Sequence, residues 1–169
     1  DLKIIRALPR RQHRTVGPWC FLDRYGPLSF TAEKPMDVAP HPHMGLQTVS
    51  WLVEGEIVHN DSLGCEALMR AGQLNLMTAG EGIAHAEETP TENSGTLEGV
   101  QLWVALPRGQ RNSAPLFHHH ASLPLLDVAA GSVTIIVGTL LGQTSPAQMF
   151  SPIIGAEIAF RTRDPLVLP

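Results

Sequence analysis

The sequence predicts an all-β protein, a β-barrel of the jelly-roll type, on three observations. The 169 residues include 15 Gly and 14 Pro, which interrupt the chain at short intervals. No long segment keeps the 3.6-residue apolar repeat of an amphipathic helix. Short apolar runs instead recur between Gly-rich turns, which is typical of sandwiches and barrels. A closed barrel also hides its strand edges, which suits a chain with only 17% charged residues.

Five segments carry this strand pattern, at residues 46–53, 73–78, 100–106, 133–137 and 158–160. Segment 100–106 is the clearest, because residues of alternating character predict a half-buried strand. Segment 46–53 is apolar and β-branched, and we expect it to break at Glu54-Gly55-Glu56 before a short continuation at 57–58. The strands therefore follow one another closely through most of the chain.

The spacing of these strands predicts three regions. Residues 1–110 hold enough strand segments for one barrel. Residues 111–124 are expected to be a linker, because the stretch from 107 to 124 has few strand signals and contains His118, His119 and His120. Residues 125–169 have room for too few strands to close a barrel, so we expect the opening strands of a second one. The chain begins with Asp1 and stops in an apolar run, so we expect further sequence beyond it.

The charge balance argues against a nucleic acid partner. The net charge is −4, from 16 acidic and 12 basic residues, whereas a phosphate-binding surface needs a cationic excess or a clear basic patch. The densest basic group, Arg10, Arg11 and Arg14, is short and is expected to be a solvated loop. No apolar stretch reaches the roughly 18 residues of a membrane span, and no secretory leader opens the chain. We therefore expect a cytoplasmic protein without a membrane partner.

Nucleophilic catalysis by cysteine or serine is not indicated. Cys20 and Cys65 are too few for a disulfide framework and are interpreted as buried apolar residues in a reducing compartment, with a single bridge left open. Neither cysteine lies beside a histidine in the sequence, and no G-x-S-x-G turn is present. The chain also lacks a Gly-rich phosphate loop followed by Lys.

Two short motifs predict a metal site. In His41-Pro42-His43 the two imidazoles are at i and i+2, so on a strand they point to the same face, about 7 Å apart. His85-Ala86-Glu87 repeats this spacing with a carboxylate in second place. On neighbouring strands these four side chains would converge and suit one divalent ion such as Fe, Mn, Ni, Cu or Zn. A position left open for water, O₂ or substrate is what a catalytic metal needs.

The alternative is that the first pair is an ordinary surface feature, because a lone H-x-H motif is a weak signal. The second pair, about 40 residues later and after several strand and turn units, favours the metal site. Glycines near both pairs, at 45, 55, 72, 80 and 82, favour it further, because they place the pairs beside strand ends where a barrel opens.

Several segments form an ordered set over about the first 110 residues. The first set is Gly17-Pro18, Phe21-Leu22-Asp23 and Gly26-Pro27, then Pro40-His41-Pro42-His43-Met44-Gly45-Leu46-Gln47-Thr48-Val49 with Gly55, then His59-x-Asp61-Ser62-Leu63-Gly64. The second set is Gly72-x₅-Thr78-x-Gly80-x-Gly82-x₂-His85-x-Glu87 and Gln101-Leu102-Trp103-Val104-x-Leu106-Pro107. Together these segments resemble the pirin family of the cupin superfamily.

The resemblance implies two cupin barrels, of which the N-terminal one binds a metal, most often Fe(II). The family's ligands fall here on His41, His43, His85 and Glu87. The resemblance also implies an oxygenase of the quercetin 2,3-dioxygenase type, in which a flavonol or similar aromatic substrate binds near the metal and Glu87 accepts its hydroxyl proton. The alternatives are an iron-dependent regulator that binds a transcription factor or metabolic enzyme, and a structural metal site without turnover. These alternatives use the same ligands and stay open.

The chain departs from the common pirin pattern at two positions near the first motif. Gln47 stands where Glu is common, which argues against a fifth ligand there and predicts less negative charge around the metal. Met44 replaces a frequent Arg and removes a cation beside the site. Both differences predict a changed substrate or a lost activity.

The remaining candidates are given structural interpretations. His59 is expected to hold the turn after it, with lining the pocket or orienting a ligand as the alternative. Trp51 and Trp103 are expected in the core, with a place in a pocket wall as the alternative. Glu88 should point away from Glu87. Glu81 is expected in solvent, and so are His118, His119 and His120, with adventitious metal binding as the alternative for these three histidines.

Overall fold

The computed structural model describes residues 3–31 and 36–167, and within these ranges it contains strands and no helix. The N-terminal part holds β1 (Ile4–Leu8), β2 (Trp19–Ser29), β3 (Val38–His43), β4 (Leu46–Asp61), β5 (Glu66–Arg70), β6 (Leu74–Thr78), β7 (Ile83–Glu88), β8 (Thr96–Ala105) and β9 (Leu116–His120). The C-terminal part holds β10 (Leu125–Val128), β11 (Gly131–Val137), β12 (Thr139–Leu140), β13 (Gln143–Thr144) and β14 (Gly155–Phe160). The all-β prediction is confirmed. The described residues form no helix that would span a membrane.

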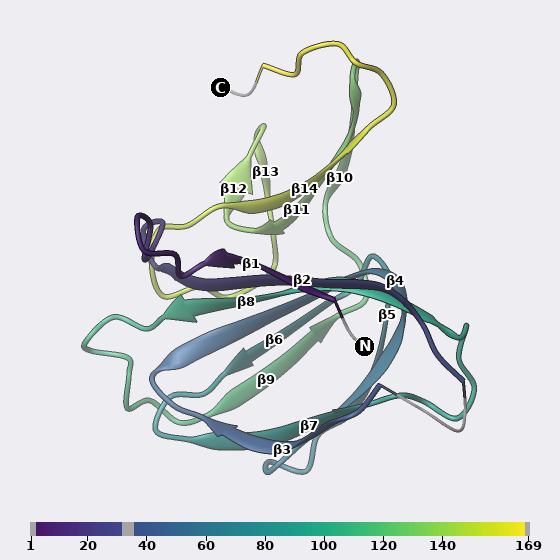
Figure 1. The fold of residues 1–169 in the computed structure, drawn as a ribbon. Coiled ribbons are helices and arrows are strands. Elements are labelled where there is room, and N and C mark those ends of the chain that lie inside the picture. The colour runs from purple at the N-terminus through teal and green to yellow at the C-terminus, as the bar shows by residue number, and fades with distance from the viewer. Residues whose placement is uncertain (1–2, 32–35, 168–169) are drawn as a thin grey trace.

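Strands β1 to β9 make one antiparallel sheet that folds over on itself as a barrel. One layer runs in the order β1-β2-β8-β4-β6-β9, and β3, β5 and β7 form the other layer with the second half of β4. Figure 1 shows β3 and β7 lying beneath the first layer. The two strands that carry the histidine motifs therefore form the floor of the barrel.

Strand β4 belongs to both layers, so the break expected at Glu54-Gly55-Glu56 is wrong. The first half of β4 pairs with β6 and β8, and the second half pairs with β5 and β7. Its register with β8 shifts between Leu52 and Glu54. Gly55 has a φ of 89°, and a Cβ there would lie 2.1 Å from the Thr96 carbonyl oxygen. The glycine therefore bends one continuous strand from one layer into the other, as at a bulge.

An apolar cluster joins the barrel to the C-terminal strands. Trp51, which is 2% exposed, packs in this cluster, as the sequence predicts for a core residue. The other buried members are Val49, Leu74, Leu76 and Val104 of the barrel, and Ile136, Val137 and Ala147 of the C-terminal part. Full burial of a side chain the size of Val, Leu or Ile stabilises the folded state by about 1.5–3 kcal/mol. The outer face of the barrel therefore serves as a packing surface.

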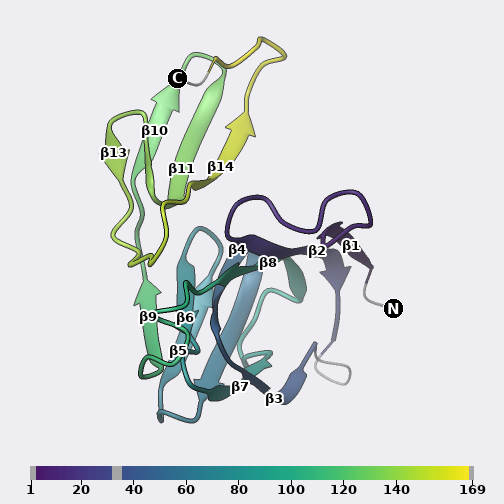
Figure 2. The same cartoon turned by 90° about the vertical axis from the view of Figure 1, so that its left-hand side faces the viewer.

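The C-terminal strands form two small sheets. β10, β11 and β14 make an antiparallel three-stranded sheet, and β12 pairs with β13. Figure 2 shows this sheet above the barrel, with the chain entering it from β9. The strand segments predicted at 133–137 and 158–160 lie within β11 and β14.

Part of the predicted linker forms a strand. β9 pairs with β6 along its whole length, from Leu74 opposite His120 to Thr78 opposite Leu116. The histidine side chains of β9 are half-buried, so the expectation that they lie in solvent is wrong. The segment has no apolar alternation of its own. It forms a strand because the edge of β6, distant in the sequence, supplies its backbone partners, and a local sequence pattern does not reveal such pairing.

The predictions for the arginine-rich loop and for the two cysteines hold in part. Arg10, Arg11 and Arg14 are exposed on a loop, as expected. Cys20 and Cys65 are both free thiols, but they are half-buried and not fully buried. The Sγ atom of Cys20 lies 3.5 Å from the Trp103 carbonyl oxygen.

Candidate metal centre

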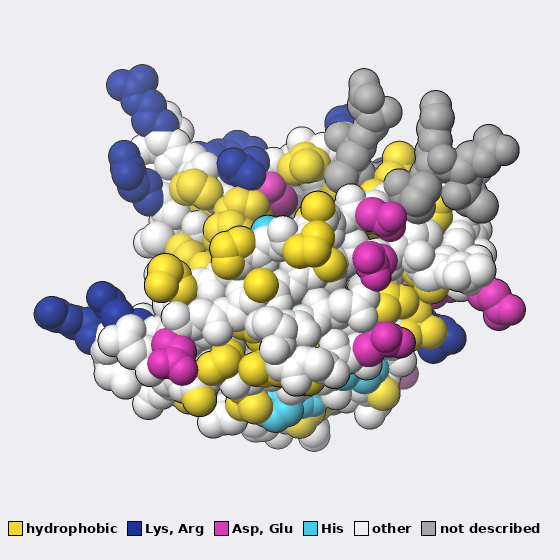
Figure 3. Space-filling model, turned by 90° about the horizontal axis from the view of Figure 1, so that it is seen from below, with side chains coloured by type: hydrophobic (Ala, Val, Ile, Leu, Met, Phe, Trp, Pro, Cys, Tyr) yellow, Lys and Arg dark blue, Asp and Glu magenta, His cyan; other side chains and the backbone are white. Residues whose placement is uncertain are grey.

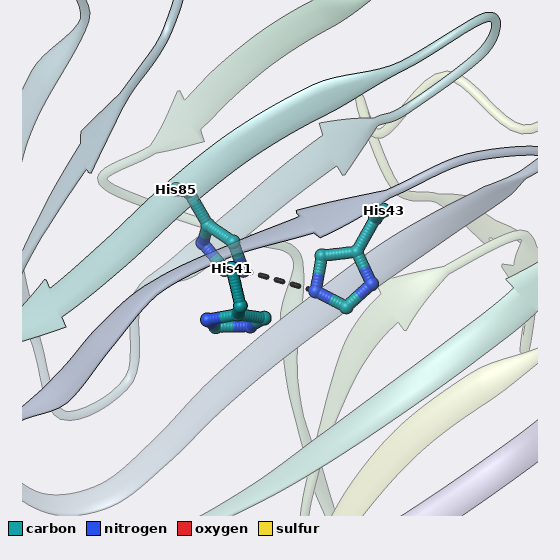
Figure 4. A group of neighbouring side chains, drawn as sticks. All are labelled: His41, His43 and His85. Atoms are coloured by element: carbon teal, nitrogen blue, oxygen red, sulfur yellow. Dashed lines mark hydrogen bonds between the residues drawn. The ribbon is translucent and has the colours of Figure 1, made fainter.

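The two histidine motifs meet across one strand pair. β3 runs antiparallel to β7, and His41 lies directly opposite His85 in the register. His43 lies two residues further along β3, on the same face as His41. The nitrogen atoms that the three imidazoles offer as ligands all lie within 4.8 Å of one another. Figure 4 shows the three side chains pointing toward one another, so the convergence expected for these histidines is confirmed.

The local sequence explains why β3 presents its histidines inward. Pro42 between them is exposed, and a proline without an N–H is tolerated on a strand at a sheet edge. After His43 the chain turns at Gly45, which has a φ of 68° that favours glycine. The Gly45 N–H then donates to the Gly80 carbonyl at 2.8 Å, which ties this turn to the turn before β7.

A hydrogen bond prepares one of these imidazoles as a ligand, and the spacing of the other two fits a shared ion. The Nδ1–H of His41 donates to the Ala39 carbonyl at 2.9 Å, so its Nε2 carries the lone pair. Nε2 of His43 lies 3.1 Å from Nε2 of His85 (Figure 4). Two ligands on one ion with bonds of 2.0–2.1 Å would be about 2.9–3.4 Å apart, so this spacing fits a shared metal.

The electrostatics also favour the neutral imidazoles that a metal requires. Burial, followed by the charge of His41, lowers the pKa of His43 to about 4. Burial and then the neighbouring His41, His59 and His43 lower the pKa of His85 to about 3. Both rings are therefore deprotonated at neutral pH. The donor set fits a divalent first-row ion, and the ion's identity is open.

Glu87 lies two residues beyond His85 on β7 and therefore on the same face of the strand. Both side chains line a cavity inside the barrel. Glu87 is not part of the three-histidine cluster. The Ser50 hydroxyl lies 2.8 Å from Oε1 of Gln101 and 3.4 Å from Oε1 of Glu87, so its single proton goes to the nearer acceptor. Burial raises the pKa of Glu87, while His41 opposes the change. Its carboxylate therefore has lone pairs free for an ion or a proton.

The histidines open into a cavity of about 200 Å³ inside the barrel. Its walls are largely apolar and aromatic, from Phe21, Tyr25, Met36, Val38 and Trp103. The rings of Phe21 and Trp103 stack at 4.1 Å, and the Trp103 ring lies 5.2 Å from that of His43. Trp103 thus lines the pocket, which is the alternative interpretation of this residue. Burial, and then the charge of Glu87, raise the pKa of Tyr25.

The outside of the floor looks different from the cavity. Figure 3 shows the barrel from below, with scattered hydrophobic side chains over its centre and charged ones mostly toward the margins. Met44, beside the site in sequence, is 71% exposed. Glu81 and Glu88 are also exposed, as predicted, and Glu88 accepts a hydrogen bond from Asn60 on the outer side.

Gln47 does not lie beside the candidate metal site, contrary to the expectation. It is completely buried on the outer face of the barrel, where its Nε2 donates to Thr78 Oγ1 and to the Gln148 carbonyl, both at 3.0 Å. The alternation of β4 explains the difference, because residues 47, 49 and 51 share the face that packs on the C-terminal strands. A Glu at this position would affect packing between the two parts, not the charge around the metal.

His59 contributes more to the site than its sequence context predicts. It holds the following turn, as expected, because its Nε2 lies 3.0 Å from Asp61 Oδ2. Its Nδ1 also lies 3.3 Å from Nδ1 of His85, and its ring stacks on Phe117 at 4.1 Å. Neither Asp61, which lies in one of the family segments, nor Phe117 was predicted to take part in the site. The i, i+2 spacing of His59 and Asp61, which matches the other two motifs, is the signal that could have identified the first.

Comparison with known proteins shows the family of this chain. The sequence profile of the Pirin family matches residues 1–104. The chain belongs to the pirin family. It is 46% identical over 159 residues to a Pseudomonas aeruginosa protein that carries the provisional name quercetin 2,3-dioxygenase, which covers 94% of this chain and 50% of that protein. A pirin-like protein of Caulobacter vibrioides is 41% identical over 160 residues, which covers 90% of this chain and 56% of that protein.

A solved structure shows the same fold. The crystal structure of a quercetin 2,3-dioxygenase from Acinetobacter baumannii matches this pirin with a TM-score of 0.86 and 42% identity, over 92% of this chain and 56% of that one. The likeness confirms the all-β cupin fold. The chain spans about half the length of the curated relatives described above.

Proposed function

We propose that this pirin holds one divalent metal on His41, His43, His85 and Glu87 and acts as an oxygenase of the quercetin 2,3-dioxygenase type. The observation that carries the proposal is the convergence of three imidazoles at an aromatic-lined cavity. Fe(II) is the first candidate, and Mn, Ni, Cu and Zn accept the same ligands. A bound redox-active ion would supply an open position at which a substrate oxygen is polarised and O₂ chemistry proceeds.

The residues around the cavity suit an aromatic hydroxyl compound such as a flavonol. The stacked rings of Phe21 and Trp103 offer a flat apolar wall beside His43. A cavity of about 200 Å³ is smaller than a pocket that encloses a whole drug-sized ligand, so we expect one ring system to enter it. The relatives named as quercetin 2,3-dioxygenases support this substrate class.

Glu87 is proposed to accept the proton of the substrate hydroxyl on one of its carboxylate oxygens. A carboxylate has two oxygen atoms, so one can bind the metal while the other accepts the proton. Ser50 does not compete for both oxygens, since its hydroxyl lies closer to Gln101. The half-buried position of Glu87 beside apolar walls also limits access of water to the transferred proton.

We further propose that residues 1–110 form the main part of the metal-binding domain, 111–124 the connection, which also adds β9 to the barrel sheet, and 125–169 the opening part of a second cupin domain. The separate three-stranded sheet of β10, β11 and β14 supports this division. The length of the relatives, about twice that of this chain, supports it as well.

The test uses protein purified without a histidine tag, with metal content measured first and O₂ uptake with quercetin measured after anaerobic loading with Fe(II). We expect about one metal per chain and uptake that depends on quercetin. Glu87→Gln should keep the fold and lose most of the uptake, while the neighbouring Glu88→Gln should keep it. Full uptake in Glu87→Gln contradicts the proposed base. Metal binding without uptake contradicts the oxygenase and favours an iron-dependent regulator.

A further inference from the structure

A chain of three polar side chains runs from the candidate metal site to a turn at the end of β4. Asp61 lies opposite His85 in the register of β4 with β7, and His59 lies opposite Glu87. Oδ2 of Asp61 is 3.0 Å from Nε2 of His59, and Nδ1 of His59 is 3.3 Å from Nδ1 of His85. The residues His59 and His85 are both 3% exposed, so solvent does not compete for these contacts.

The proton positions along this chain follow from the acceptor at its end. Oδ1 of Asp61 accepts the backbone N–H groups of Leu63 at 2.9 Å and Cys65 at 3.1 Å, which fixes the carboxylate. A carboxylate can only accept, so His59 must place its proton on Nε2. A neutral imidazole has one N–H, so Nδ1 of His59 then carries a lone pair and accepts from Nδ1–H of His85.

The consequence lies at the other side of the His85 ring. With its proton on Nδ1, His85 directs the Nε2 lone pair toward Nε2 of His43, 3.1 Å away, which is the side where the histidines converge. We propose that Asp61 and His59 are positioning residues that fix the His85 tautomer and hold its Nε2 ready to bind the metal. This inference rests on the proposed metal site and adds a role for two residues outside the ligand set.

The packing around His59 supports a fixed orientation. The ring stacks on that of Phe117 of β9, with the ring centroids 4.1 Å apart and the planes at 7°, so rotation of the imidazole would disturb this contact. The turn that carries Asp61 is joined to β7 from the other side, because Ser62 N–H donates to the Ala84 carbonyl at 2.9 Å. Partners of this kind behind a ligating histidine orient the ring and raise its basicity.

Asp61→Asn provides a sharp test, because it should reverse the direction of both hydrogen bonds that link Asp61, His59 and His85. The amide oxygen keeps the bonds from Leu63 and Cys65, so the turn should survive. The amide nitrogen then takes the place of Oδ2 and donates to Nε2 of His59. His59 must move its proton to Nδ1, and His85 must move its own to Nε2. That proton would occupy the metal-facing nitrogen.

Two measurements on the full chain decide the question, with Glu88→Gln as the matched control. Glu88 is also a carboxylate bonded between β7 and β4, but it lies on the outer side and contacts Asn60. The first measurement is the long-range ¹H–¹⁵N spectrum of the histidine rings in metal-free protein. We expect His85 as the Nδ1–H tautomer in the unaltered chain and in Glu88→Gln, and as the Nε2–H tautomer in Asp61→Asn.

The second measurement is titration with Co(II), followed by its visible absorption. We expect the affinity to fall by about 10- to 100-fold in Asp61→Asn and to stay unchanged in Glu88→Gln. An unchanged His85 tautomer, or an unchanged affinity, in a folded Asp61→Asn variant overturns the proposal. If the unaltered chain binds no Co(II), the proposed metal function fails, and the spectra of the metal-free protein still decide whether Asp61 sets the tautomer.

Discussion

Replacing Gln47 with Glu tests the assignment of this residue to the packing surface between the barrel and the C-terminal strands. The side chain is completely buried, and its Nε2 donates to Thr78 and to the Gln148 carbonyl. A carboxylate has no proton to donate, so the Gln148 carbonyl loses its partner, at a cost of about 1–3 kcal/mol. The Thr78 hydroxyl can rotate and donate instead. Oε1 of Gln47 has no partner among the described residues to stabilise a negative charge.

Gln47→Glu should therefore lower the free energy of unfolding by about 3 kcal/mol at pH 8, where the buried carboxylate is ionised. For a domain of this size, that loss lowers the melting temperature by about 6–12 °C. Burial raises the pKa of such a Glu above its unfolded value, so the destabilisation is full above the folded pKa and is relieved as the pH falls through it. At pH 5 the protonated acid can again donate to the Gln148 carbonyl, and the loss relative to the unaltered chain should shrink.

The assay is thermal unfolding at pH 8 and pH 5, with Gln47→Met as the matched control. The methionine loses the same two hydrogen bonds without adding a charge, so its loss should not depend on pH in this range. A melting temperature for Gln47→Glu that matches the unaltered chain at pH 8 would refute the reasoning. A loss equal to that of Gln47→Met at both pH values would refute the part that concerns the charge.

A substitution in the turn before β7 and a change of pH test two further features of the structure. Gly80→Ala should lower the free energy of unfolding by more than about 2 kcal/mol, because Gly80 has a φ of 53° and its Cβ would lie 2.0 Å from the Ser113 carbonyl oxygen. Urea unfolding should show a loss of only about 1 kcal/mol for Gly72→Ala, which has a positive φ but open space around its Cβ. Metal-free protein should lose stability as the pH falls from about 6.5 toward 4, because unfolded histidines take up protons that buried His43 and His85, with pKa values of about 4 and about 3, resist. Urea unfolding at pH 7 and pH 5 should differ by about 1–2 kcal/mol for each of these histidines, and His43→Gln should show a smaller difference.

The sequence predicts the parts of this site that depend on strand alternation alone. The i, i+2 spacing places His41 and His43 on one face of β3, and the same spacing places His85 and Glu87 on one face of β7. The contact between His59 and His85 was missed, because it depends on the register of β4 with β7. Register between distant segments is set by the whole barrel, not by local spacing.

Two misjudged elements have a related cause. Gly55 is typical of a strand end, but here it bends a strand whose two halves find different partners. The β9 segment has no apolar alternation, yet β6 recruits it as an edge strand. Gln47 was assigned to the wrong face of β4, although the alternation of that strand, counted from Trp51 in the core, would have placed it on the outer side.

The pairing of β3 has a consequence for folding. Within the described residues, β3 pairs with β7 alone, and two of its 6 residues are the candidate ligands His41 and His43. An ion bound by these residues and His85 would crosslink the two strands beyond their backbone ladder. A slip of one residue would turn both histidines to the other face, so only the native register could bind the ion. Metal supply would then select correctly paired barrels, adding about 2.7 kcal/mol at a free concentration of 100 Kd, and would slow amide exchange in β3.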